Sequence, residues 1–171
     1  MITALVRGPF YWAFLLLLSL ALMATALVYQ YGLDYPPCVL CIHVRMLTVL
    51  LGAVALAMLF LRRWATVRLA GHVATAAVLA WLAERSWQLL ATERGWILGS
   101  CDMQSGLPTW FALERWFPRL FEIHEPCGYT PDMPWGLTMA ESLVGLSWPL
   151  AAVAACLAIV AAMDLGRGRR G

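Results

Sequence analysis

Two cysteines separated by two residues, Cys38 and Cys41, are the residues of this sequence most suited to chemistry. They follow Pro36 and Pro37 and stand at the start of a long apolar stretch, so we expect them at the N-terminus of a helix. The unpaired N–H groups and partial positive charge of a helix N-terminus favour thiolate over thiol, and thiolate is the reactive form. Arg45 follows Cys41 by four residues and would share its helix face. A guanidinium there can stabilise a thiolate or donate to a ligand carbonyl, so the pattern indicates thiol redox chemistry.

The other cysteines leave alternatives open. Cys101 and Cys127 are 26 residues apart, and Cys156 lies in an apolar run. Four thiols could bind zinc, but zinc ligands usually come in closely spaced pairs, which Cys101 and Cys127 do not form. The C-x-x-C pair could instead be a structural disulfide, and Arg45 could simply extend to the membrane interface. We expect Cys156 to behave as a small packed hydrophobe.

The composition predicts an integral membrane protein. The 171 residues are 62% hydrophobic and 13% charged, with a mean hydropathy of +0.74, and a soluble domain needs far more surface charge. A net charge of +2 without a dense basic stripe gives no support for a nucleic-acid partner. Four segments reach the roughly 20 apolar residues that span a bilayer as a helix. They cover about residues 10–29, 42–61, 69–90 and 144–163.

We therefore expect an all-α fold, a polytopic four-helix membrane bundle that forms a single domain over residues 1–171. The first segment is too long for the apolar core of a signal peptide, and we interpret it as an uncleaved helix. Loops are expected at about 30–41 and 91–143, with little strand. The aromatic and aliphatic residues between Cys101 and Cys127 predict one short amphipathic helix at the membrane surface.

The placement of arginines predicts the orientation. Seven arginines fall on one side of the four segments, and three fall on the other. The seven are Arg7, Arg62, Arg63, Arg68, Arg167, Arg169 and Arg170, and the three are Arg94, Arg115 and Arg119. Because positive loops stay in the cytoplasm, both termini should be cytoplasmic and both larger loops periplasmic in a Gram-negative cell. Four of the cysteines then lie where disulfides persist.

Small and polar residues within the spans lead to two structural expectations. Small residues let helices approach closely, and we expect the bundle interior to contain Ala53, Ala57, Ala74 and Ala77. His72 lies near the cytoplasmic end of the third segment. We expect it to be solvated or at the membrane interface.

Several motifs together resemble a known family. They are Pro37-Cys38-Val39-Leu40-Cys41-Ile42 with Arg45, Cys101-Asp102, Leu107-Pro108-Thr109-Trp110, Trp116-Phe117-Pro118 and Gly136-Leu137-Thr138-Met139-Ala140-Glu141. With four spans, this arrangement resembles the bacterial disulfide bond formation protein B (DsbB) family over nearly the whole chain. Val44 departs from the pattern, because family members often carry Glu or Gln there. Cys156 matches no redox position of the family.

The resemblance implies a thiol oxidase of the bacterial inner membrane. Cys101 would be attacked by a reduced periplasmic thioredoxin-fold thiol oxidase (DsbA-like), leaving Cys101 and Cys127 reduced. Electrons would pass to Cys38 and Cys41 through a transient Cys38–Cys127 bridge and on to a membrane quinone, either ubiquinone or menaquinone. Cys41 would face the quinone, while Arg45 would bind a quinone oxygen and stabilise the Cys41 thiolate. No metal is expected.

Two alternatives remain at this point. One is a non-catalytic membrane protein whose outer domain is stabilised by a metal or by disulfides. The other reverses the direction of electron flow, as in quinone or vitamin K reductases with four helices and a C-x-x-C. Those reductases usually carry the motif at a later helix, so the early position of Cys38 disfavours this interpretation.

Overall fold

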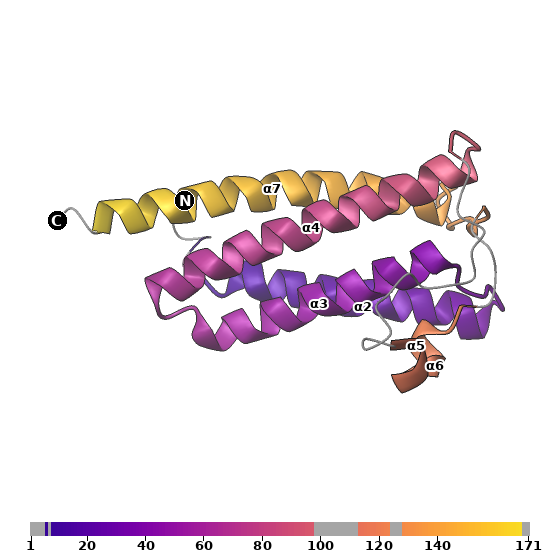
Figure 1. The fold of residues 1–171 in the computed structure, drawn as a ribbon, viewed down its shortest axis with the longest axis horizontal. Helices are drawn as coiled ribbons and strands as arrows, with labels where there is room; N and C mark the ends of the chain where they lie inside the picture. The colour runs from indigo at the N-terminus through magenta and orange to yellow at the C-terminus, as the bar shows by residue number, and fades with distance from the viewer. Residues whose placement is uncertain (1–5, 7, 98–112, 124–127, 169–171) are drawn as a thin grey trace.

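The protein is a bundle of long helices, seen here in a computed structural model that describes residues 6, 8–97, 113–123 and 128–168 (Figure 1). The long helices are α2 (Phe10–Gly32), α3 (Val39–Leu61), α4 (Ala65–Glu93) and α7 (Met139–Gly168), and the short ones are α5 (Leu113–Trp116) and α6 (Pro118–Phe121). Within the described ranges, β pairing is limited to one bridge between Asp132 and Thr138. The predicted all-α four-helix class is confirmed.

All four long helices are long and apolar enough to cross a membrane. They have 23 to 30 residues, which at 1.5 Å per residue exceeds the roughly 30 Å of a hydrocarbon core. Each predicted span lies inside one helix, but the helices extend further than predicted. For example, α4 continues to Glu93 and α7 already begins at Met139. The apolar runs mark only the lipid-immersed part, whereas helical hydrogen bonding continues into the interface.

The helices pack in sequence order, with α2 on α3, α3 on α4, and α4 on α7 (Figure 1). Their shared core includes the fully buried side chains of Trp12, Leu15, Leu47, Leu51 and Leu79. No contact of similar extent joins α2 to α7 in the described part of the chain. We call the end of the bundle that holds the start of α3 the cysteine end, and the opposite end, with the α3–α4 connection, the link end.

Glycines, rather than the predicted alanines, mark the closest helix approaches. A Cβ atom on Gly52 would lie 3.2 Å from Cβ of Ser19 in α2, and one on Gly71 would lie 2.5 Å from the Met58 sulfur. The prediction chose the wrong small residues: Ala53, Ala57 and Ala77 are exposed on the bundle surface and Ala74 is half-buried. Apolar residues cover most of these helices, so no continuous polar face in the sequence fixes which side points inward.

His72 and Cys156 also differ from expectation. His72 is completely buried, with Nε2 3.2 Å from the Val6 carbonyl oxygen. Its ring centroid lies 4.7 Å from that of Trp12 and 5.4 Å from that of Tyr11. The expected solvated or interfacial position was wrong, because α2 and Val6, four residues before α2, cover this face of α4. Cys156, expected to be packed, is exposed on α7.

Candidate functional site

Cys38 and Cys41 form the N-terminus of α3, as the sequence predicted. Cys38 is the N-cap residue, and its sulfur accepts the backbone N–H of Cys41 at 3.3 Å. The two sulfurs are 2.7 Å apart, and Cys38 is only 4% exposed. The amide and the helix dipole both favour negative charge on the Cys38 sulfur. The sulfurs are close enough that only small side-chain movements are needed to form a disulfide when an oxidant removes two electrons and two protons.

A tight turn after α2 places this pair. The backbone N–H of Tyr35 donates to the carbonyl of Tyr29 at 3.1 Å, and Asp34 takes a positive φ of 55°. Asp tolerates this left-handed conformation better than most residues. Pro36 and Pro37 then keep the backbone extended until helix α3 begins.

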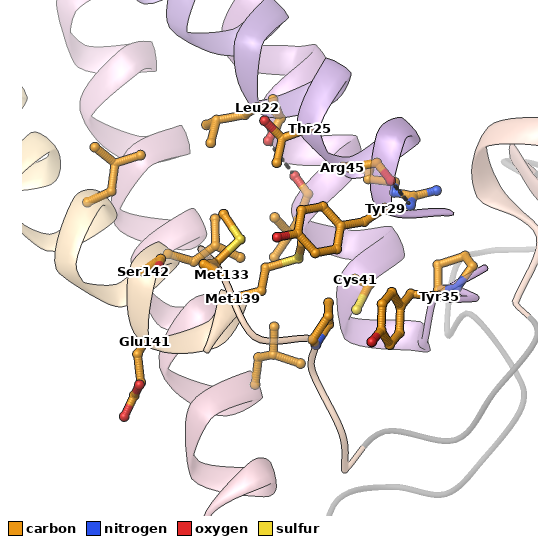
Figure 2. Close-up of a pocket in the computed structure, with 18 of the residues that line it drawn as sticks. Leu22, Thr25, Tyr29, Tyr35, Cys41, Arg45, Met133, Met139, Glu141 and Ser142 are labelled. Carbon is orange, nitrogen blue, oxygen red and sulfur yellow. Dashed lines mark hydrogen bonds between the residues drawn. The ribbon is translucent and has the colours of Figure 1, made fainter. Parts of the chain in front are cut away.

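A cavity of about 560 Å³ lies beside the pair at the cysteine end, and Figure 2 shows Cys41 and Arg45 among its lining residues. Its walls come from α2, α3 and α7, with Leu89 of α4 and residues between 129 and 137. Most of the lining is apolar, including Leu22, Val44 and Met139. Ligand sites of this size are typically apolar with a few polar groups that fix orientation.

Arg45 is a buried cation at the wall of this cavity, only 6% exposed. Its Nη1 donates to Gln30 Oε1 at 2.5 Å and to the Leu120 carbonyl at 3.0 Å, and its Nη2 donates to the Ala26 carbonyl at 3.2 Å. A guanidinium has five N–H groups. Within the described residues, these bonds leave the Nε–H and one Nη2–H for a ligand. Val44 adds apolar surface to the cavity wall.

A loop segment, residues 129–137, covers the outer side of the cavity, and we call it the roof. Tyr29 Oη donates to the Asp132 carbonyl at 3.2 Å, and Trp135 Nε1 donates to Ser142 Oγ at 3.1 Å. Thr130 also donates its hydroxyl to the carboxylate of Glu93 at the end of α4. Hydrogen bonds to α2, α4 and α7 therefore hold the roof, which begins two residues after Cys127.

Three tyrosines that line the cavity stand in a row. The ring of Tyr35 lies 6.2 Å from that of Tyr29 and 6.2 Å from that of Tyr129. A hydrogen bond with Tyr35 is the main cause that raises the pKa of Tyr129 above its ordinary value of 10.0. Tyr129 is therefore a neutral phenol at physiological pH and can donate a hydrogen bond at the mouth of the cavity.

Comparison with known proteins identifies the family. A family model described as "Disulfide bond formation protein DsbB" matches residues 8–159. The chain belongs to the DsbB family. The match and the four membrane-length helices make it a multi-pass inner-membrane oxidoreductase of disulfide bond formation.

Curated DsbB relatives match over most of their length. "Disulfide bond formation protein B 2" of Pseudomonas aeruginosa (strain PAO1) is 32% identical over 171 residues, which covers 94% of this chain and 92% of the relative. "Disulfide bond formation protein B" of Shewanella denitrificans is 31% identical, covering 82% and 78%. The protein of the same name from Shewanella frigidimarina is 28% identical, covering 84% and 89%.

The structure brings together some of the site residues predicted for this DsbB protein. Cys38, Cys41 and Arg45 lie together at the head of α3, and Cys41 and Arg45 line the cavity. Cys101 and Cys127 lie outside the described residues. Among the residues that are described, no three His, Cys, Asp or Glu side chains gather closely enough to hold a metal ion.

Sequence reasoning missed the polar groups that surround Arg45 and the roof. They are Gln30, Tyr29, Tyr35, Tyr129, Glu93 and Thr130. Gln30 gave one available signal, because it is a polar side chain near the end of an otherwise apolar run. The Thr138-x-x-Glu141 spacing gave another, since it is typical of a helix N-terminus.

Proposed function

We propose that this DsbB protein is a quinone-dependent thiol oxidase whose electrons leave through Cys41 into the cavity beside Arg45. The dithiol of Cys38 and Cys41 loses two electrons and two protons and becomes a disulfide. A quinone bound in the cavity would supply the oxidising power by accepting those two electrons and two protons as it is reduced to the hydroquinone. Membership of the DsbB family and the position of Cys41 on an apolar cavity support this proposal.

The residues of the cavity fit a quinone ring. An apolar lining at the side of a membrane bundle suits a lipid-soluble ligand, and the cavity is lined by α2 and α7, two helices without extensive mutual contact in the described residues. The spare N–H groups of Arg45 suit a carbonyl oxygen, and a developing negative charge there would be stabilised by the guanidinium. The same cation, one helical turn from Cys41, also favours the thiolate at that residue.

Electrons enter from the other cysteine pair in this proposal. The thiolate of a reduced periplasmic thioredoxin-fold protein (DsbA-like) attacks Cys101 of a Cys101–Cys127 disulfide, and its second thiol releases Cys101, so that the partner leaves oxidised. Cys127 then attacks Cys38 of the Cys38–Cys41 disulfide, which releases Cys41 as a thiolate. Cys101 next attacks Cys127 in the Cys38–Cys127 bridge and releases Cys38, so that the Cys101–Cys127 disulfide is restored. Each step exchanges one disulfide for another without a change in the number of electrons. In the sequence, the roof begins two residues after Cys127, which supports this path.

The orientation follows from the arginine distribution, with both termini in the cytoplasm and the cysteine end in the periplasm. This orientation places the four thiols where the soluble partner works. Thiol-specific labelling of intact cells with a membrane-impermeant reagent tests it. Labelling of a cysteine introduced at Ser100, but not of one introduced at Gly168, is expected.

The decisive experiment measures quinone reduction by the purified protein with a reduced thioredoxin-fold partner. The wild type should reduce a ubiquinone, with one hydroquinone formed for each partner disulfide. Cys41→Ser should abolish the reaction. Cys156→Ser is the matched control, because Cys156 is exposed on α7, away from the cavity lining, and it should retain full activity. Coupled oxidation that persists in Cys41→Ser would refute the proposed path.

A further inference from the structure

The guanidinium of Arg45 also holds part of the long loop in place. Its Nη1 donates to the backbone carbonyl of Leu120 at 3.0 Å, and Leu120 belongs to α6. The neighbouring carbonyl, that of Arg119, accepts a hydrogen bond of 2.5 Å from the Tyr31 hydroxyl at the end of α2. Two successive carbonyls of α6 are therefore bonded to the bundle, and Figure 1 shows α6 beside the ends of α2 and α3.

This contact is specific rather than a loose surface association. Phe121, the last residue of α6, is only 5% exposed, so its ring is buried while the backbone before it is hydrogen-bonded. A carbonyl at the C-terminal end of a helix carries partial negative charge, which suits a cationic donor. Docking of α6 thus satisfies carbonyls that the short helix cannot satisfy itself.

Gln30 ties the same guanidinium to α2. Its Oε1 accepts from Nη1 of Arg45 at 2.5 Å, so one nitrogen serves both Gln30 and Leu120. Gln30 and Tyr31 are adjacent residues, and neither lines the cavity. Either residue can therefore act on a bound ligand only through Arg45 or through α6.

We propose that Gln30 and Tyr31 are positioning residues, which hold Arg45 and α6 in one arrangement so that quinone binding and docking of residues 113–123 favour each other. This inference rests on the proposed function. The donors left on Arg45 are Nε–H and one Nη2–H, so a carbonyl in the cavity can bind without displacing α6. Coupling between two sites is reciprocal: docked α6 orients Arg45 for the ligand, and the ligand stabilises docked α6.

The coupling serves the electron path. Residue 123 precedes Cys127 by four residues, so the docking of α6 restricts where that cysteine can lie relative to Cys38. If α6 docks most strongly when quinone is bound, electrons would pass to Cys38 and Cys41 mainly when an electron acceptor is available.

The test uses the full chain in detergent and a short-tailed ubiquinone analogue as the probe. Amide hydrogen exchange of residues 113–123 is measured with and without the analogue, together with its Kd and the kcat and KM for its reduction. In the wild type, the analogue should slow exchange of this segment about fivefold or more, the lower end of typical coupling between two sites. Tyr31→Phe and Gln30→Leu should each raise Kd and KM by a similar factor, with a smaller change in kcat.

Two further variants make the result specific. Gln30→Glu, unlike Gln30→Leu, keeps an acceptor for Arg45. Its Kd and its protection of residues 113–123 should therefore be near the wild-type values. Gln88→Leu is the matched control, since Gln88 also accepts from an arginine, Arg85 Nη1 at 3.0 Å, but on α4 away from α6. It should change neither quantity.

The outcomes separate this inference from the proposed function. Normal quinone reduction, combined with exchange of residues 113–123 that does not respond to the analogue, would overturn the coupling alone. The same conclusion follows if Tyr31→Phe leaves Kd unchanged. Failure of the wild type to bind or reduce the analogue would overturn both proposals.

Discussion

Thr138 and Glu141 cap the N-terminus of α7 reciprocally. The backbone N–H of Thr138 donates to Glu141 Oε2 at 3.0 Å, and the backbone N–H of Glu141 donates to Thr138 Oγ1 at 3.2 Å. This is the capping-box arrangement, in which two otherwise unpaired amides are satisfied together. Thr138 Oγ1 also donates to Glu93 of α4 at 3.3 Å, and Arg94 forms an ion pair with Glu141. The cap therefore joins α4, α7 and the end of the roof.

Replacement of Thr138 by alanine should destabilise the cysteine end. The change removes the N-cap acceptor, which is typically worth about 1 kcal/mol, and also the hydroxyl donor to Glu93. We expect the free energy of unfolding to fall by about 1–2 kcal/mol, measured by chemical unfolding in detergent. Because Thr138 borders the roof, KM for a quinone should also rise.

Thr92→Ala is the control for that variant. The Thr92 hydroxyl donates to the Gln88 carbonyl within its own helix at 2.8 Å, so its loss breaks no contact between helices. Its effect on unfolding should be within about 0.5 kcal/mol. Equal losses in the two variants would show that the cap of α7 has no special role.

Removal of the Tyr35 hydroxyl should lower the pKa of Tyr129. The hydrogen bond between them is the main cause that holds this pKa above 10.0. A raised pKa means that the bond stabilises the protonated phenol, so its contribution is present at neutral pH and is lost as pH rises through the raised pKa. In Tyr35→Phe the Tyr129 titration should shift toward lower pH. Ultraviolet difference titration against the Tyr35→Phe, Tyr129→Phe double variant isolates the signal, and an unmoved titration would exclude the bond.

The main elements of the fold could be predicted because lipid imposes a simple rule. Backbone groups in a bilayer must be bonded within the segment, so four long apolar runs had to be four helices. The C-x-x-C pair after two prolines was equally informative. Prolines often stand just before a helix, and the unpaired backbone N–H groups of the first helical turn can donate to a cysteine sulfur. Cys38, Cys41 and Arg45 could therefore be assigned to one helix end from residue types and spacing.

The roof and the partners of Arg45 could not be predicted in this way. Gln30, which is hydrogen-bonded to Arg45, is 15 residues away from it in the sequence, and Leu120 is 75 residues away. Leu120 accepts through its backbone carbonyl, which any residue type would offer. Tertiary hydrogen bonds to backbone atoms leave no trace in residue type. The inward faces of α3 and α4 were missed for a different reason. Apolar residues cover most of both helices, and their few polar residues do not form one continuous polar face.

The adjacent residues Gly52 and Ala53 offer a direct test of which side of α3 faces the bundle interior. A Cβ atom on Gly52 would already lie 3.2 Å from Ser19, whereas Ala53 is exposed on the surface of the bundle. Gly52→Val should therefore separate α2 from α3 and cost about 1–3 kcal/mol, while Ala53→Val should change stability by less than about 0.5 kcal/mol. Thermal unfolding of the two variants measures the difference. Similar values would mean that α2 and α3 do not approach closely at Gly52.

The buried ring of His72 should support the link end without taking part in electron transfer. His72 packs against the rings of Tyr11 and Trp12, and its Nε2 is bonded to the Val6 carbonyl. His72→Ala leaves a cavity and should cost about 3 kcal/mol. His72→Phe keeps an aromatic ring but loses the hydrogen bond, and it should cost about 1 kcal/mol.

Activity separates this structural role from a catalytic one. Leu89, which lines the cavity, is 17 residues further along α4 than His72, about 25 Å at 1.5 Å per residue. Quinone reduction per folded molecule should therefore remain within about twofold of the wild type in His72→Phe, since a loss of stability at the link end does not alter Cys41 or Arg45. A fall in kcat of about tenfold or more, at a temperature where the variant is fully folded, would contradict a purely structural role and place His72 on a path that affects the reaction.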